Sequence, residues 1–507
     1  MAGGDPRASR DLAWPCTCGR GFCAAGRGRA GAGVPRVSGS EAALTPWAGA
    51  SEIATAVAGG QVAATAVTAA ALARIAHANP RLNAFTDVVA ARAMARAAAI
   101  DAALAAGRPV GPLAGVPFAV KNLIDVAGLP TRAGSRINRD HPPAARDGTL
   151  VARLEAAGAV LVGALNMGEY AYDFTGENVH DGASRNPHDT TRMTGGSSGG
   201  SGAAVAGGLV PIALGSDTNG SIRVPASFCG VFGLKPTYGR LSRAGSFPFV
   251  ASLDHLGPFA RNTGDLAAAY DAMVGPDPAD PVCTDRPAEP VGAALDAGIA
   301  GLRIGLAGGY FRAGASAEAL AALETVAAAL GPVQAVELPE AARARASAYV
   351  ITTTEGAALH LQRLRERPED FDPDVRDRLI AGAMVPAAFV AQAQKFRRWY
   401  RDAVLRVFAT VDVILAPATP CVAPAIGQKT FVLDGREHPL RPNIGIYTQP
   451  ISFIGLPVVA VPVPLPGGLP IGVQVIAAPW REDLALRVAR ALERQGIVRA
   501  PVPPAAP

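Results

Sequence analysis

The sequence predicts an α/β protein in which helices and short buried strands form layers. Alanine-rich stretches with helical periodicity alternate with short runs of apolar, often β-branched residues. This alternation is typical of layered α/β domains. The composition agrees, because 49% of the 507 residues are hydrophobic and 18% are charged, which is enough apolar material for a large core. Length alone allows one large domain or two to three smaller ones.

The individual elements follow from periodicity and from residues that end helices. Helices are expected over residues 50–77, 81–106, 149–157, 198–208, 316–330 and 340–407. Strands are expected at residues 160–162, from Ile304, and at residues 333–338, 411–415, 458–463 and 473–477. Gly59 and Gly60 interrupt the first helix, Ser316 is a candidate N-cap, and Pro373 and Pro386 break the long helical stretch.

The first 45 residues differ from the remainder of the chain. They are rich in Gly, Ala and Arg and lack periodicity, so we expect a disordered extension over residues 1–45 before a domain over residues 46–500. Cys16, Cys18 and Cys23 fit no zinc spacing and lack a fourth ligand, so no metal site is expected there.

Charge and cysteine content argue against several classes of protein. The extension carries about +3 of the net charge of +5, so nucleic-acid binding is not indicated. No apolar run long enough to cross a membrane avoids proline and charge. The six cysteines form no recognisable disulfide framework, which favours a cytoplasmic protein.

The glycine- and serine-rich stretch over residues 194–240 carries the strongest functional signal. Its clusters at residues 195–200 (GGSSGG) and 217–221 (DTNGS) flank an apolar segment. Such backbone can direct several N–H groups at one point, which suits a phosphate or the oxyanion of an acyl-transfer reaction. No lysine follows the glycines, as a Walker loop requires, and a loop precedes them where a dinucleotide site needs a strand. Acyl transfer is therefore the preferred interpretation.

A serine nucleophile needs a base, and the composition points to lysine. None of the seven histidines lies between the two clusters, and only four of the 47 basic residues are lysines. Lys121 ends the apolar run of residues 115–120, where burial would favour its neutral form. Arginine cannot release its proton in this way. Lys235 is a rival on the same grounds, and a lysine that only binds backbone carbonyls is the structural alternative.

Three blocks resemble the amidase signature family, whose members hydrolyse amides with two serines and a lysine. The blocks are residues 115–122 around Lys121, residues 195–200 and residues 220–225 (GSIRVP). Their order and spacing fit the family, and the resemblance covers residues 48–495. It implies a single large α/β domain with a central mixed β-sheet between helical layers.

The resemblance also implies a role for each residue of the triad. Ser221 is expected to be the nucleophile, and Ser197, on a cis Gly196–Ser197 peptide bond, is expected to bridge it to Lys121. Neutral Lys121 would take the proton through Ser197 and return it to the leaving nitrogen. The oxyanion hole is expected to consist of the backbone N–H groups of Thr218, Asn219, Gly220 and Ser221.

Two charged residues bracket the expected nucleophile. Asp217 and Arg223 are interpreted as an ion pair that supports the loop, with two solvated charges as the alternative. Asn219 departs from the glycine or alanine that the family often has at this position, so the family's backbone role for the hole is expected here but not its detailed shape.

Residues 173–180 and 246–255 resemble the carboxybiuret hydrolase branch, which acts on a small anionic ureido compound in cyanuric acid breakdown. Such a substrate needs a cation for its carboxylate and acceptors for its N–H groups. The candidate binding residues are Tyr172, Asp173, Thr175, Arg192 and Gln449, with Arg223 as a second candidate cation. A structural role is the alternative for each. His180 and His255 are expected to be hydrogen-bonded core or rim residues, and no cofactor or metal is implied.

Other functions stay open at this point. The A-type component of a glutamyl-tRNA(Gln) amidotransferase would release ammonia from glutamine for a tRNA-bound substrate, and a general amidase would cleave many small amides. A catalytically inactive binding protein is disfavoured by the intact Lys121, Ser197 and Ser221. The branch implies a small helical accessory subunit, and a homodimer or a heterotetramer is expected. The composition and charge indicate neither a membrane nor a nucleic acid as a partner.

Overall fold

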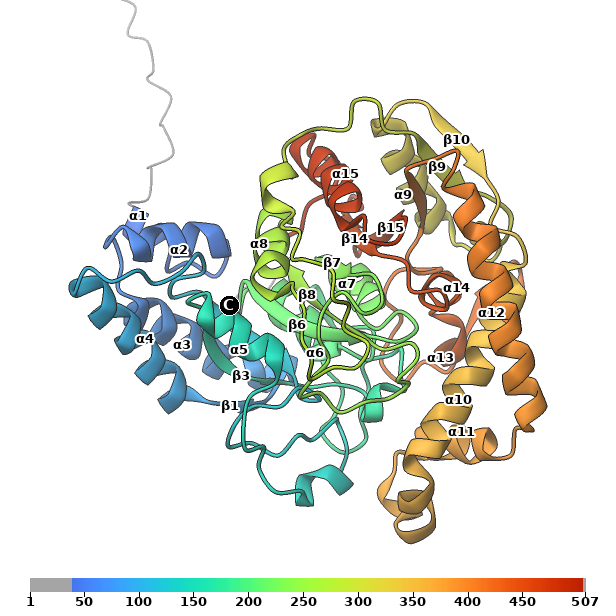
Figure 1. Cartoon of the computed structure of the whole chain (residues 1–507), viewed down its shortest axis with the longest axis horizontal. Helices are drawn as coiled ribbons and strands as arrows, with labels where there is room; N and C mark the ends of the chain where they lie inside the picture. Colours follow the sequence, from blue (N-terminus) through green and yellow to red (C-terminus); the bar gives the residue numbers. More distant parts are fainter. Residues whose placement is uncertain (1–38, 505–507) are drawn as a thin grey trace, which may run out of the picture. The chain divides into compact units, whose positions relative to one another are not determined.

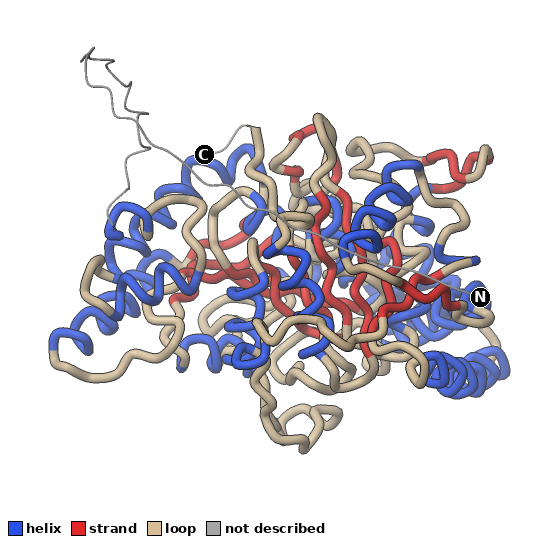
Figure 2. The backbone as a smooth tube through the Cα atoms, turned by 90° about the horizontal axis from the view of Figure 1, so that it is seen from above, coloured by secondary structure: helices blue, strands red, loops and turns tan. Residues whose placement is uncertain are grey.

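An 11-stranded mixed β-sheet crosses the part of the chain that the structure describes, residues 39–504 of a computed structural model. Helices cover the sheet from either side (Figures 1 and 2). Helices α6 and α7 pack together on the central strands, and α5, α8 and α15 form a second group. The predicted α/β architecture, with a central mixed sheet between helical layers, is therefore confirmed.

The strands of this sheet, in spatial order, are β1 (Phe85–Val88), β3 (Val160–Leu165), β2 (Pro117–Lys121), β6 (Ile212–Asp217), β8 (His255–Ala260), β7 (Phe232–Lys235), β14 (Val458–Val463), β15 (Ile471–Ala477), β11 (Val413–Pro417), β9 (Ile304–Ala307) and β10 (Val333–Val336). Two small hairpins pair β4 (Arg185–Asn186) with β5 (Asp189–Met193) and β12 (Thr430–Leu433) with β13 (Arg436–Pro439).

The α-helices are α1 (Gly39–Ala42), α2 (Ala50–Ala58), α3 (Ala64–Leu82), α4 (Ala90–Ala105), α5 (Thr149–Ala156), α6 (Gly199–Ala206), α7 (Arg223–Cys229), α8 (Thr263–Met273), α9 (Ala317–Ala329), α10 (Ala341–Glu366), α11 (Pro373–Ala383), α12 (Ala387–Val407), α13 (Leu440–Asn443), α14 (Gln449–Ser452) and α15 (Glu482–Arg494). The short 3₁₀ turn η2 (Glu169–Ala171) lies beside the site described below.

Parallel pairing in the centre of the sheet positions the site. Strand β2 runs parallel to both β3 and β6, and Val120 pairs with Leu214 in this register. Both β2 and β6 are buried along their whole length, which explains their unbroken apolar sequence. Because parallel strands end at the same edge, Lys121 at the end of β2 and Asp217 at the end of β6 both lie at that edge of the sheet.

Several helices begin where a serine or a proline in the sequence predicted a boundary. The Ser316 hydroxyl caps α9 by accepting from the Ala319 N–H at 3.3 Å. Helix α11 begins at Pro373 and α12 begins directly after Pro386, because a proline is tolerated at the first helical turn but not in a helix interior.

The main errors in the predicted secondary structure concern short strands. The helix expected over residues 81–106 is wrong at its start, because residues 85–88 form β1 and pair antiparallel with β3. Helix α4 begins only at Ala90. Strands β2, β6, β7 and β8 were not predicted as strands, since partners distant in sequence complete their hydrogen bonding.

The domain begins earlier than predicted. Ala43 is buried, and the carbonyl of Leu44 accepts from Arg74 Nη1 at 3.0 Å, so residues 43–44 belong to the packed domain and not to the extension. The expectations for residues 1–38, including Cys16, Cys18 and Cys23, lie outside the described residues.

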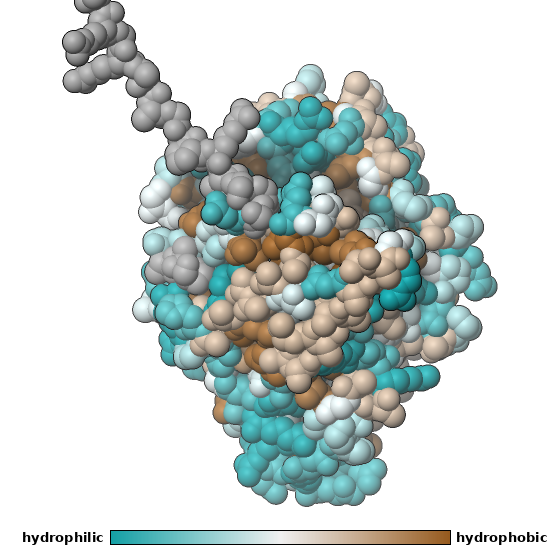
Figure 3. Space-filling view, turned by 90° about the vertical axis from the view of Figure 1, so that its left-hand side faces the viewer, coloured by the Kyte–Doolittle hydropathy of each residue, from teal (hydrophilic) through white to brown (hydrophobic). Residues whose placement is uncertain are grey.

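Three further features of residues 39–504 concern possible membrane helices, the cysteines and one face of the surface. No single helix in this range has both the length and the apolar composition of a membrane span, and α11 and α12 meet these criteria only as a pair bent by 96°. The three cysteines of this range, Cys229, Cys283 and Cys421, are free thiols. On the face that carries the alanine-rich α3 and α4, apolar and hydrophilic residues are intermixed (Figure 3).

Candidate active site

Lys121 lies at the centre of a buried group of serine hydroxyls. Its Nζ donates to Ser197 Oγ at 2.6 Å, to Ser216 Oγ at 2.8 Å and to Ser198 Oγ at 3.0 Å. The lysine side chain is fully buried, so these three hydroxyls match its three N–H donors. Only Ser197 was predicted as a partner. Ser216 joins the group because β6 runs parallel to β2, which the sequence does not reveal.

Burial changes the acidity of Lys121. Removal from water lowers the pKa of its amine to about 7, although the negative charges of Asp217, Asp254 and Asp173 act in the opposite direction. A large fraction of the amine is therefore neutral near pH 7, which a general base requires.

Lys235 has the same burial but a different setting. Burial lowers the pKa of its amine to about 7 as well. However, its Nζ donates to the carbonyl oxygens of Pro236, at 3.1 Å, and Leu456, and lies 3.3 Å from His255 Nε2. Lys235 thus binds backbone carbonyls and no serine, which is the structural alternative considered for a buried lysine.

The backbone around Ser197, in the loop before α6, is closely surrounded by neighbouring segments. The Gly196–Ser197 peptide bond is cis, and the carbonyl of Ser197 accepts from the Gly168 N–H at 3.1 Å. A Cβ atom on Gly196 would lie 2.2 Å from Asp173 Oδ2, so only glycine fits at this position.

The second loop, residues 217–221, presents unused N–H groups. Within the described part of the chain, the backbone N–H groups of residues 218–221 donate no hydrogen bond. Gly220 has a φ of +144°, and a Cβ there would lie 2.2 Å from Thr448 Oγ1. The Thr448 hydroxyl also donates to the carbonyl of Asn219 at 2.6 Å. The backbone N–H groups of this loop are therefore free to donate to a ligand.

A buried ion pair supports that loop. Asp217 accepts from Arg223 through both carboxylate oxygens, each at 3.0 Å, and neither side chain is exposed. Asp217 also accepts from the Ile222 N–H at 3.1 Å and from the Ser452 hydroxyl at 3.1 Å. Burial alone would raise the pKa of Asp217, but the charge and N–H groups of Arg223 hold it well below its usual range.

A narrow pocket opens beside Ser221. Its walls are formed by Ala171, Tyr172, Asp173, Phe174, Thr218, Asn219, Ser221, Phe249, Tyr349, Thr352, Arg378 and Gln449. Three of the candidate substrate-binding residues, Tyr172, Asp173 and Gln449, therefore line the same pocket as Ser221. Thr175 and Arg192 do not line this pocket.

Thr175 and Asp173 are engaged with each other. Asp173 Oδ1 accepts from the N–H of Thr175 at 2.9 Å and from its hydroxyl at 2.8 Å, and Asp173 Oδ2 accepts from the Gly176 N–H at 2.6 Å. Thr175 therefore stabilises the turn that follows Asp173. Its predicted role as a substrate-binding residue is not supported by the lining of the pocket.

Arg192, which was predicted as a cation for the substrate, does not line the pocket either. It lies on the partly exposed β5 of the β4–β5 hairpin, with its Nε 3.5 Å from Asp189. Arg223, the second candidate, is committed to Asp217 and to the carbonyl of Thr448 and the amide oxygen of Gln474.

Arg378 of α11 is the arginine that lines the pocket, and the sequence contained no signal for it. Its guanidinium lies over the ring of Tyr172, 3.9 Å from the centroid, and Nη2 donates to the carbonyl of Tyr172 at 2.6 Å. Among the described residues, no hydrogen bond is made by Arg378 Nη1 or by the buried hydroxyl of Tyr172. Gln449 Oε1 accepts from Arg345 Nε at 2.9 Å.

Both histidines near the site are hydrogen-bonded. His255 Nδ1 lies 3.0 Å from the carbonyl oxygen of Asp217, and burial lowers the pKa of the ring well below its usual value. His180 Nε2 lies 2.9 Å from Glu169 Oε1. Across residues 39–504, no three His, Cys, Asp or Glu side chains form a group suited to a metal ion.

Comparison with known proteins identifies the family to which the chain is similar. Residues 66–486 match the family model described as Amidase. AtzE of Pseudomonas sp. (strain ADP), a 1-carboxybiuret hydrolase subunit, is 55% identical over 451 residues, which cover 88% of this chain and 98% of that protein. The A-type component of the glutamyl-tRNA(Gln) amidotransferase of Roseiflexus castenholzii (strain DSM 13941 / HLO8) is 40% identical over 464 residues, covering 86% of this chain and 93% of that protein.

Solved structures of related proteins are also similar to this chain. One, described as an unexpected vestigial protein complex that reveals the evolutionary origins of an s-triazine catabolic enzyme, superposes with a TM-score of 0.88 at 55% identity, covering 89% of this chain and 100% of that one. A bacterial aryl acylamidase superposes with a TM-score of 0.82 at 28% identity, covering 88% and 96%. The matched range of the family model includes Lys121, Ser197, Ser221 and Arg378.

Proposed function

The chain belongs to the amidase signature family of hydrolases that act on carbon–nitrogen bonds other than peptide bonds, and we propose that it releases ammonia from a small anionic ureido substrate, 1-carboxybiuret. The observations that carry the chemistry are the buried Lys121 with its serine partners and a pocket that Ser221 lines. The 55% identity to a carboxybiuret hydrolase subunit over most of both chains supports the substrate.

In this proposal Ser221 attacks the carbonyl carbon of the scissile amide. Neutral Lys121 takes the proton of Ser221 through the Ser197 hydroxyl, which donates one proton while it accepts another. The short distance of 2.6 Å between Lys121 Nζ and Ser197 Oγ supports this relay. The relay then delivers the proton to the leaving nitrogen, the C–N bond breaks, and ammonia departs from an acyl-enzyme.

The free N–H groups of residues 218–221 are proposed to hold the negative charge that develops on the carbonyl oxygen. Loss of one such donor typically costs about 3–4 kcal/mol of transition-state stabilisation. The buried Asp217–Arg223 pair would keep these donors in place without contacting the substrate. Water then attacks the acyl-enzyme, with the same lysine and serine as base, and frees Ser221.

Arg378 is proposed as the partner of the substrate carboxylate. It lines the pocket, and its Nη1 makes no hydrogen bond to the described residues, so it can bind an anion without losing another partner. The unpaired hydroxyl of Tyr172 and the carboxamide of Gln449 are proposed to bind the ureido groups. Asp173, whose two oxygens already accept from the following turn, would shape the pocket.

The same contacts weigh against glutamine as the substrate. Glutamine carries an ammonium group that needs a carboxylate or several free acceptors. Asp173 is the acidic residue of the pocket walls, and both of its oxygens are engaged. A glutaminase of the amidotransferase type, to which the chain is 40% identical, is therefore the second candidate, and a general small-amide amidase is the third.

A small helical accessory subunit belongs to the proposal. The relative AtzE is named as one subunit of a hydrolase, and a structure 55% identical to this chain is described as a protein complex. We propose that this chain also works with a second, small subunit, in a heterotetramer, in the cytoplasm. Isolation from its native host as a single chain or as a simple homodimer would contradict this part of the proposal.

The test of the function is ammonia release by the purified protein, coexpressed with any small subunit encoded beside it. The substrates are carboxybiuret, biuret, simple aliphatic and aryl amides, and glutamine, with Ser221→Ala as the blank. A strong preference for carboxybiuret supports the proposal. Preference for glutamine would assign the amidotransferase function, and broad turnover would leave a general amidase.

A further inference from the structure

Glu169 is a buried carboxylate that the chemistry above does not use. Its side chain is fully buried, and its two oxygens bind two different segments. Oε1 lies 2.9 Å from His180 Nε2, and Oε2 accepts from the backbone N–H of Asp372 at 2.7 Å. Burial raises the pKa of Glu169, while these hydrogen bonds act in the opposite direction. A carboxylate in this position is costly unless both oxygens are satisfied.

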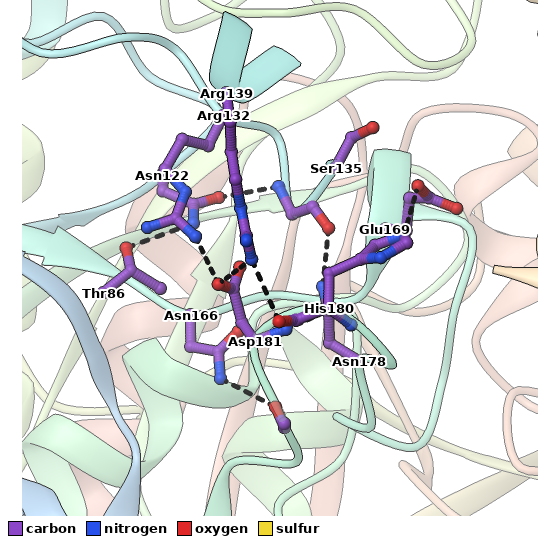
Figure 4. Close-up of polar contacts among 12 residues, drawn as sticks. Thr86, Asn122, Arg132, Ser135, Arg139, Asn166, Glu169, Asn178, His180 and Asp181 are labelled. Atoms are coloured by element: carbon purple, nitrogen blue, oxygen red, sulfur yellow. Dashed lines mark hydrogen bonds and ion pairs between the residues drawn. The ribbon is translucent and has the colours of Figure 1, made fainter. Parts of the chain in front are cut away.

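The first partner anchors Glu169 to a polar network. The carbonyl of His180 accepts from Arg139 Nη2 at 3.0 Å, and Arg139 also pairs with Asp181 at 2.6 Å. Arg132 binds the same carboxylate. Figure 4 shows Glu169 and His180 beside this network of arginine, aspartate and asparagine side chains. Glu169 Oε1 is therefore held rigidly within the segment that precedes the serine-rich loop.

The second partner is the start of α11. Asp372 caps this helix, with its carboxylate accepting from the Asp374 N–H at 2.9 Å. The same helix carries Arg378, whose guanidinium stacks on Tyr172 and binds the Tyr172 carbonyl. Glu169 precedes Tyr172 by three positions, so it connects two walls of the pocket at their bases.

The backbone between Glu169 and Tyr172 is strained. Tyr170 and Ala171 have φ values of +48° and +61°, in the left-handed region that non-glycine residues rarely adopt. Such conformations are unfavourable and persist only when their surroundings impose them. The Tyr170 ring packs on His360, 4.0 Å between centroids, and its hydroxyl donates to Asn138 at 3.1 Å. Glu169 is thus one of the contacts that hold a strained pocket wall.

We propose that Glu169 is a positioning residue that sets the Tyr172–Arg378 wall and thereby the preference for carboxylate-bearing substrates. This inference rests on the proposed function, because Arg378 is the proposed partner of the substrate carboxylate. Glu169 itself touches neither the pocket nor the serines, so its effect is on substrate binding and not on proton transfer.

The test compares Glu169→Ala, Glu169→Gln and a matched control, Glu482→Ala. Glu482 is also buried and accepts a backbone N–H, that of Thr237, at 2.7 Å, but it does not line the pocket. For Glu169→Ala we expect KM for a carboxylate-bearing amide to rise about tenfold, since small displacements at a site are costly. We expect kcat to change less than about twofold and KM for a neutral amide to stay the same. Glu169→Gln, which keeps an acceptor for Asp372, should restore most of the affinity.

Equal losses of kcat and melting temperature in Glu169→Ala and Glu482→Ala, with KM unchanged, would overturn the proposal and assign Glu169 a purely structural role. Amide hydrogen exchange separates this result from a failure of the proposed function. Should wild-type protein cleave none of the amides, the proposed function fails. Faster exchange of residues 169–174 and 372–378 in Glu169→Ala, but not in Glu482→Ala, still supports the positioning role, and unchanged exchange refutes it.

Discussion

Replacement of Ser216 by alanine tests whether Lys121 acts as the base. Ser216 Oγ accepts from Lys121 Nζ at 2.8 Å and is one of three hydroxyls that stabilise the charged ammonium form. Removing an acceptor that favours the charged form lowers the pKa of the amine. The acidic limb of the pH–rate profile should therefore move to lower pH in Ser216→Ala.

The size of the shift follows from the structure. A hydrogen bond to a charged group contributes about 1.5–3 kcal/mol, and one pKa unit corresponds to about 1.4 kcal/mol. Ser216 borders a cavity of about 250 Å³, so water can replace part of the lost bond and the lower end of this range applies, about one unit. With the pKa of Lys121 at about 7, only about 3% of the amine is neutral at pH 5.5. A pKa of about 6 in the variant would raise this fraction to about 24%.

The assay is kcat/KM for ammonia release from a neutral amide between pH 5 and 9, because this parameter reports the pKa values of the free enzyme. Ser201→Ala is the matched control. Ser201 is buried in α6 and donates to the carbonyl of Leu214 at 2.8 Å, without contact to Lys121. A wild-type profile that is flat from pH 5.5 to 8.5 would refute Lys121 as the base. A Ser216→Ala profile that matches wild type, or moves to higher pH, would refute the hydrogen-bond argument.

Three other substitutions test the remaining parts of the site. Ser221→Ala should lower kcat at least about 10⁴-fold with an unchanged melting temperature, and retained turnover would remove Ser221 as the nucleophile. Asp217→Asn leaves Arg223 as an unpaired buried charge and should cost about 3–5 kcal/mol. Calorimetry should detect this as a melting temperature lower by about 3–5 °C at this chain length, and a change below about 1 °C would contradict it. Arg378→Gln should raise KM for carboxybiuret about tenfold or more but leave KM for a neutral amide unchanged, and an equal rise for both would exclude a carboxylate site.

The fold and the residues of the candidate site were largely predictable because their signals are local. Periodicity and proline placement predicted α9, α11 and α12, since helix hydrogen bonds join residues close in sequence. Lys121 stood out because it is one of four lysines among 47 basic residues and follows an apolar run. The glycine-rich clusters placed Ser197 and Ser221 on tight loops.

Other expectations failed where the partners are distant in sequence. Residues 85–88 were predicted as helix from their alanine-rich surroundings, but pairing with β3 makes them a strand. Arg192 was expected to be a cation near the site, but it pairs with Asp189 three residues away, and the arginine that lines the pocket, Arg378, is distant in sequence.

By itself, the sequence determined the α/β layering and the family, and it singled out the serine and lysine residues proposed for acyl transfer. Only the tertiary structure decided which hydroxyls surround Lys121 and which arginine faces the pocket. Ser216 reaches Lys121 through the parallel pairing of β2 and β6, and Arg378 reaches Tyr172 because α11 packs on the loop that follows β3. These contacts depend on the packing of segments that are far apart along the chain. A local pattern of residues does not indicate how strongly such segments pack together.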